Sequence, residues 1–109
     1  MPHKLLRVFV GESDRHGGQP LYTAVVEAAR HFGLAGATVF KGIEGYGSHA
    51  VLHAARVFDL STDLPVLVEI VDTEEKIGAF LPELEKLIRD GLVTLEAIEV
   101  IRFSGGKRQ

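Results

Sequence analysis

The chain has 109 residues, of which 46% are hydrophobic and 25% charged, and these values predict one globular domain spanning residues 1–109. Its formal net charge of -3 argues against nucleic acid as a partner, and the lack of cysteine excludes disulfides, thiolate metal ligands and a cysteine nucleophile. No segment is long enough to span a bilayer as a helix and no signal peptide pattern is present, so we expect a cytoplasmic protein.

The first part of the chain predicts a strand, a helix and a second strand. Lys4–Val10 is rich in β-branched and aromatic residues and stops at a glycine. The following apolar residues recur at helical spacing, with Pro20 in the first turn of the helix and Gly33 at its C-terminal cap. Ala37–Lys41 is the second predicted strand.

Two further strands are predicted before a second helix. They are Val51–Phe58 and Pro65–Val71, and the latter is almost continuously apolar, as expected of a strand covered on most of its surface. The second helix is expected to begin at Asp72, whose carboxylate would cap it, and to end at Gly91. Pro82 lies inside this helix and predicts a kink or a break near residues 78–81.

The last predicted strand is Val93–Phe103, and residues 101–109 form a tail that is expected to be mobile. The order is strand, helix, strand, strand, helix, strand, with a further division of the middle that gives the additional strand. It indicates an α+β protein with a ferredoxin-like βαββαβ sandwich, in which two helices cover one face of an antiparallel sheet. The other face would then be open. Because residues 66–71 are apolar on both sides, we expect this face to be hidden by self-association.

The segment FKGIEGYGSHAVLH, residues 40–53, places three glycines, an aromatic residue and two histidines between predicted strands. Glycines let backbone N–H groups approach an anion, and Lys41 could supply a counter-charge for phosphate. The spacing does not match a Walker-type phosphate loop. On residue types alone, a flexible glycine hairpin is the preferred interpretation.

The same segment also contains a potential metal site. His49 and His53 are four residues apart, and Glu44 could add a carboxylate. Half-exposed strand residues remain the simpler interpretation of the two histidines.

A second polar loop, residues 11–19, joins the first strand to the first helix. Glu12, Asp14 and Arg15 concentrate charge there, in a position where binding residues are often found. A local salt bridge explains these residues equally well. Arg102 is a further candidate, since it could reach an anionic ligand from the end of the last strand.

Four phrases of the sequence, in order, carry a resemblance that spans residues 5–100: GESDRHGGQPLY, GLAGATVFKGIEGYGSH, DLPVLVEIVDTEEKIGAFLP and GLVTLEAIEV. Together they resemble the PII-like family, long known as a domain of unknown function and related in fold to nitrogen-regulatory PII proteins. The resemblance implies a ferredoxin-like protomer that forms a homotrimer. It also implies an adenine nucleotide, ADP, ATP or AMP, held as an effector in the clefts between subunits.

The resemblance further assigns a ligand-binding segment after the second strand, in which a lysine-glycine pair and a glycine-aromatic-glycine motif border the nucleotide. Its residues here are Lys41, Gly42, Glu44, Gly45, Tyr46, Gly47, Ser48 and His49. Glu12, Asp14 and Arg15 would line or support the site, and Arg102 would come from a neighbouring subunit. The glycine-aspartate-glycine-lysine phosphate loop of PII proteins is missing.

These implications predict a regulatory protein that is not an enzyme and needs no cofactor. It would change the order of a loop when the nucleotide binds and thereby regulate a partner, for which a membrane transporter is one candidate. The alternative is a divalent-metal-binding trimer that resembles cation-tolerance proteins and uses His49, His53 and Glu44.

Overall fold

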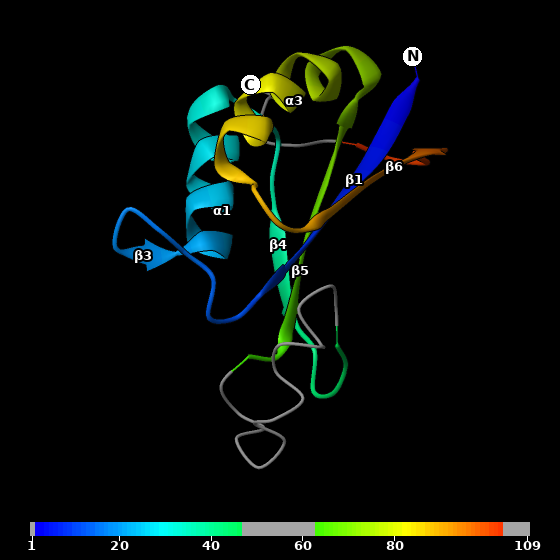
Figure 1. The fold of residues 1–109 in the computed structure, drawn as a ribbon. Coiled ribbons are helices and arrows are strands. Elements are labelled where there is room, and N and C mark those ends of the chain that lie inside the picture. The colour runs from blue at the N-terminus through cyan, green and yellow to red at the C-terminus, as the bar shows by residue number, and fades with distance from the viewer. Residues whose placement is uncertain (1, 47–62, 104–109) are drawn as a thin grey trace.

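The computed structural model describes residues 2–46 and 63–103. Four antiparallel strands form its main sheet in the order β4-β5-β1-β6. They are β1 (His3–Gly11), β4 (Thr38–Lys41), β5 (Pro65–Thr73) and β6 (Leu92–Ile98). The helices α1 (Leu21–Phe32) and α3 (Glu74–Leu87) lie on one side of this sheet (Figure 1). This arrangement confirms the expected ferredoxin-like α+β fold.

The core lies between the sheet and the two helices. Buried side chains alternate along β1 and β5, as the period of two in a strand requires. The helices contribute the opposing apolar surface, and the rings of Phe32 and Phe80 meet at 5.4 Å between their centroids. The largest fully buried hydrophobic side chains are Phe80, Leu6, Ile70, Ile77, Leu84, Val8, Val25, Val66 and Val68.

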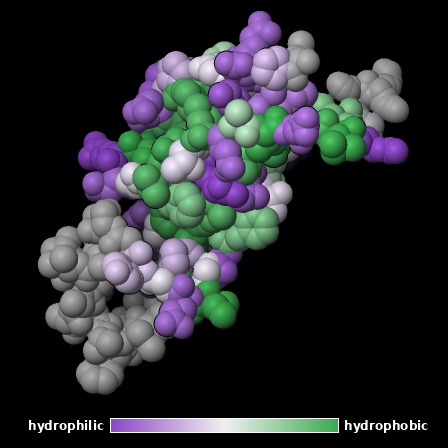
Figure 2. Space-filling view, turned by 90° about the vertical axis from the view of Figure 1, so that its right-hand side faces the viewer, coloured by the Kyte–Doolittle hydropathy of each residue, from purple (hydrophilic) through white to green (hydrophobic). Residues whose placement is uncertain are grey.

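The sheet face turned away from the helices, which we call the open face, carries the residues that alternate with this core. Cross-strand register places Phe40, Leu67, Phe9 and Leu92 in one row across all four strands. Phe40 is 48% exposed and Leu92 56% exposed. On the side where β1 and β6 lie in Figure 1, hydrophobic residues gather over the middle of the surface and hydrophilic residues interrupt them (Figure 2).

The first predicted elements are confirmed with small shifts at their ends. Pro20 is the N-cap of α1 rather than part of its first turn, while Gly33 forms the predicted C-cap with a left-handed φ of 97°. A short hairpin of β2 (Arg15–His16) and β3 (Gln19–Pro20) precedes α1. The predicted strand at residues 51–58 and the last six residues of the predicted tail lie outside the described residues.

The prediction that Asp72 caps the second helix is wrong. Asp72 is still part of β5 and is only 2% exposed, and the side chain of Thr73 caps α3 by accepting a hydrogen bond from the backbone N–H of Lys76. The Asp72 carboxylate instead accepts the N–H of Ala35 at 2.9 Å and that of Thr73 at 2.7 Å. Its hydrogen bond to Ala35 therefore links the connection between α1 and β4 to the end of β5.

The other corrections concern the end of α3 and of the last strand. The predicted break near residues 78–81 is absent, and α3 is continuous through Pro82. Both Pro82 and Gly78, whose carbonyl loses its partner there, are exposed to water. The helix ends at Leu87, before Gly91, whose added Cβ would lie 2.9 Å from the carbonyl oxygen of Phe9.

The last strand ends at Ile98, five residues before the predicted end at Phe103. The ring of Phe103 then packs edge-on against that of His3, at 5.6 Å between centroids. Within the described ranges, no helix is long and apolar enough to cross a membrane.

We predict that Asp72→Ala lowers the free energy of unfolding by about 1–3 kcal/mol, because two partly buried N–H groups lose their acceptor. Thr73→Ala removes only the helix cap and is expected to cost about 1 kcal/mol. Urea unfolding of both variants, with exposed Glu85→Ala as control, measures the difference. A larger loss in Thr73→Ala than in Asp72→Ala would contradict the assigned role of Asp72.

Candidate functional site

The candidate site lies at the end of the sheet where β1 and β4 finish and β5 begins. The pairing of Gly11 with Pro65 and of Lys41 with Val66 brings these three strand ends level with one another. The polar loop after β1 and the glycine segment after β4 are therefore neighbours in space, although almost thirty residues separate them. Nothing in the sequence alone indicates that these two segments meet.

The link between them is an ion pair between Glu12 and Lys41. The Lys41 ammonium lies 2.7 Å from Oε2 of Glu12, with the lysine side chain 56% exposed and the glutamate 25% exposed. The hydrogen bond to Glu12, followed by its charge, raises the pKa of Lys41 above the ordinary value. The ammonium is thus held in place at the sheet end while much of its surface stays open to solvent.

The backbone fixes Glu12 in this position. Its N–H donates to the carbonyl of Leu64 at 2.8 Å, which extends the pairing of β1 with β5 by one residue. The second carboxylate oxygen, Oε1, is buried and has no hydrogen-bond partner in the part of the chain that the structure describes. Glu12 therefore has unused capacity to accept one more donor.

Asp14, a candidate binding residue from the sequence, makes a hydrogen bond that holds the turn after β1. Its Oδ2 accepts the N–H of Gly11 at 2.8 Å, which closes the turn after β1. Ser13 donates from its N–H and its hydroxyl to Oδ1 of Asp63, at 3.2 and 2.8 Å. The contact between Ser13 and Asp63 was not predicted, because nothing in the local sequence indicates a contact between residues 50 positions apart.

Arg15 and Arg102 do not join the Glu12–Lys41 pair. Arg15 donates to the carbonyl of Gly18 at 2.8 Å and so closes the short hairpin, whose turn uses the positive φ of Gly17 and Gly18. Arg102 follows β6, which ends beside His3 at the opposite end of the sheet. At about 3.3 Å per residue, the nine-residue β1 separates the two ends by roughly 27 Å.

In the glycine segment after β4, the backbone of Gly42 and of Gly45 lies close to Pro65, which explains why these positions carry glycine. The Gly42 N–H donates to the carbonyl of Pro65 at 2.7 Å, and a Cβ on Gly42 would lie 2.9 Å from Cγ of the proline. A Cβ on Gly45 would lie 3.0 Å from the same atom. The Gly42 N–H is thus engaged by the carbonyl of Pro65 at the start of β5.

The remaining residues of the predicted segment divide into two groups. Glu44 and Tyr46 are exposed, with Tyr46 87% exposed. Gly47, Ser48, His49 and His53 lie outside the described residues, and the metal-site prediction falls there with the two histidines. Within the residues described, no group of three metal-ligating side chains is present.

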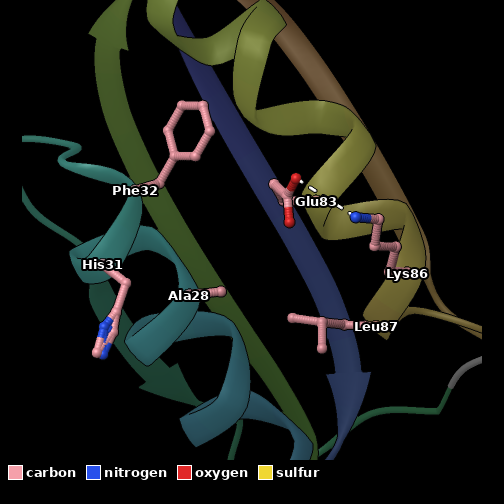
Figure 3. A pocket seen from close by; sticks show the side chains of 6 residues that line it. All are labelled: Ala28, His31, Phe32, Glu83, Lys86 and Leu87. Atoms are coloured by element: carbon pink, nitrogen blue, oxygen red, sulfur yellow. Dashed lines mark ion pairs between the residues drawn. The ribbon is translucent and has the colours of Figure 1, made fainter.

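A groove of about 300 Å³ lies elsewhere, between α1 and α3 (Figure 3). Ala28 and Leu87 face each other across it, an ion pair of 3.5 Å joins Glu83 to Lys86, and His31 points away from α3. None of these residues was a candidate from the sequence. The Glu83–Lys86 pair lies within one helix and is more exposed than the Glu12–Lys41 pair, which joins two separate segments of the chain.

Comparison with known proteins gives a consistent result. Residues 3–100 match the family model DUF190, described as Uncharacterized ACR. A UPF0166 protein of Aquifex aeolicus is 48% identical over 98 residues, covering 90% of this chain and 92% of that protein. A UPF0166 protein of Methanocaldococcus jannaschii is 37% identical over 100 residues, with 91% and 92% coverage.

Among solved structures, the chain is similar to CPII of Thiomonas intermedia K12, a nitrogen regulatory PII-like protein. The form of CPII bound to ADP, AMP and acetate has a TM-score of 0.64 and 21% identity, covering 93% of this chain and 90% of CPII. Another form was solved bound to ADP and bicarbonate. At this level of identity, the similarity establishes the common fold.

We predict that Glu12→Gln lowers the pKa of Lys41 back toward 10.5, because the hydrogen bond to the carboxylate is its main cause of elevation. The pKa of Lys41 is higher in the folded protein than in the unfolded chain. The ion pair therefore stabilises the fold fully at pH values below the pKa of the unfolded lysine, and this stabilisation is lost as pH rises through the pKa of the folded protein. An NMR titration of the Lys41 side chain measures the shift. Glu44→Gln serves as control, and a pKa that stays equally raised in Glu12→Gln would contradict the pairing.

Proposed function

Because this chain belongs to the DUF190 family, whose fold it shares with PII-like proteins, we propose that it is a PII-like regulatory protein of the cytoplasm. In this proposal it forms a homotrimer and binds an adenine nucleotide as its effector. The nucleotide lies in a cleft between subunits, and its binding alters the segment after β4 to regulate a partner protein. A membrane transporter is the partner class we propose.

The observation that carries the nucleotide proposal is the exposed ammonium of Lys41, held at the sheet end by Glu12. A fixed but solvent-accessible cation is suited to a phosphate, which would compete with the Glu12 carboxylate for it. The neighbouring Tyr46, 87% exposed, offers an aromatic face on which adenine can stack. That CPII binds ADP and AMP on the same fold supports this choice of ligand.

The open face supports the homotrimer proposal. Its row of Phe40, Leu67, Phe9 and Leu92 crosses the full width of the sheet, and the described residues place no helix over it. An exposed apolar row of this kind is typical of an interaction site. Copies of the chain that meet through this face would bring two strand-end sites near a common cleft.

We predict that Phe40→Lys dissociates the assembly, because a charged side chain would replace a half-exposed aromatic at the β4 end of the apolar row. Light scattering of the wild-type chain is expected to give a mass three times the 11.9 kDa of one chain. The control is Ile43→Lys, at a side chain that is already 94% exposed. A wild-type chain that stays monomeric at all concentrations would contradict the proposed assembly.

We predict that Lys41→Gln weakens ADP binding at least about tenfold, or ~1.4 kcal/mol, because a charge-assisted contact to phosphate is lost. Isothermal titration calorimetry with ATP, ADP, AMP and bicarbonate measures this effect. Lys86→Gln makes the same charge change on α3, where the lysine pairs with Glu83 rather than with Glu12, and is expected to bind like the wild type.

The same titrations separate the nucleotide proposal from the metal alternative. Absence of binding heat with every adenine nucleotide would remove the nucleotide from the proposal. Stoichiometric binding of copper or zinc that His49→Ala abolishes would favour the metal-binding alternative instead.

A further inference from the structure

The open face carries an unbalanced cluster of charges at its centre. Arg7 on β1 contacts Glu69 on β5 through Nε and Glu96 on β6 through Nη1, each at 3.0 Å. Hydrogen bonding to Glu69, together with the charges of both glutamates, raises the pKa of Arg7, so the guanidinium stays charged. One positive and two negative groups leave this Glu69–Arg7–Glu96 cluster with a net charge of -1.

Apolar side chains border the cluster on both sides along the strands. Two positions toward the site end lies the row that contains Phe9 and Leu67, and two positions the other way Leu5 pairs with Val71. A surface that covers these apolar residues must also cover Arg7 and Glu69, which lie between the two rows, and it meets Glu96, which lies opposite Leu5. The side chain of Glu96 is 56% exposed and that of Glu69 only 29%, so Glu96 has the most hydration to lose.

The described strands offer no matching excess of positive charge on this face. Alternation along the described strands places one further charged or titratable side chain on this face besides the cluster. It is His3, which lies at the far end of β1 and contacts Phe103. Thr38 on β4 and Thr94 on β6 occupy the remaining places in the Arg7 row, and Lys4 and Lys41 belong to the opposite face. A second copy of this face therefore presents the same negative excess rather than a counter-charge.

We propose that association of copies through the open face is linked to uptake of a proton by the Glu69–Arg7–Glu96 cluster, with Glu96 as the acceptor. This inference rests on the proposed homotrimer and adds a means of regulating it. A neutral Glu96 leaves one balanced Arg7–Glu69 pair in the interface, which removes the cost of burying an uncompensated carboxylate. Because the assembled state binds more protons, lower pH strengthens association.

The test measures the association constant of the full chain as a function of pH. Sedimentation equilibrium measures it from about pH 6.5 to about pH 8.5, in a fixed urea concentration that half dissociates the wild-type assembly. We expect the association constant to fall as pH rises, by up to about tenfold per pH unit for each subunit. Glu96→Gln keeps the shape of the side chain without its charge. It is expected to associate at least about tenfold more tightly than the wild type at the upper end of this range and to lose most of the pH dependence.

A matched control separates the cluster from net charge. Glu85→Gln makes the same charge change on the exposed surface of α3 and is expected to keep the wild-type profile. A trimer whose association is independent of pH, or equal effects of the two substitutions, would overturn the proton linkage while leaving the homotrimer in place.

Two other outcomes overturn the inference for different reasons. Weaker association of Glu96→Gln would mean that a basic group of the neighbouring copy meets the carboxylate, and an unchanged pH profile in this variant would assign the proton to another group such as His3. A chain that is monomeric at every pH, without urea, would reject the proposed homotrimer itself.

Discussion

The antiparallel register between β1 and β5 places both the Lys41 site and the charged cluster of the open face. Because Gly11 lies opposite Pro65, the end of β1 is level with the start of β5, and Glu12 can reach Lys41 across the first residues of β5. The same register puts Arg7 opposite Glu69. Since a slip of one residue would turn every side chain to the other face, burial of the β1 and β5 core residues enforces both arrangements at once.

Three carboxylates of this protein show how position in the fold decides what an acidic side chain does. Asp72 is buried and satisfies two backbone N–H groups, so it stabilises a connection. Glu12 is partly exposed and holds a lysine that remains open to solvent, which suits a ligand site. Glu96 shares an arginine that already has a partner, which makes it sensitive to anything that removes water from the open face.

The proposed ligand site and the proposed subunit interface are coupled by the strands they share. β4 contributes Phe40 to the open face and Lys41, the next residue, to the site. Successive residues of a strand point to opposite faces, so packing of one copy against another positions Phe40 and thereby the lysine beside it. A nucleotide that prefers one position of Lys41 would, by reciprocity, also favour one state of the assembly.

The sequence by itself determined the fold class and the order of the main-sheet strands and helices that the structure describes, because the apolar periodicities of β1, α1 and β5 and the C-cap of α1 are local signals. It did not indicate the β2–β3 hairpin. It also named Glu12 and Lys41 as candidates from residue type, and the four phrases identified the family. Only the tertiary structure decided that these two side chains form one pair, that Gly42 and Gly45 make room for Pro65, and that Asp72 is a buried acceptor rather than a helix cap. These features depend on contacts between residues far apart in the chain, and such contacts leave no pattern in either segment when it is considered alone.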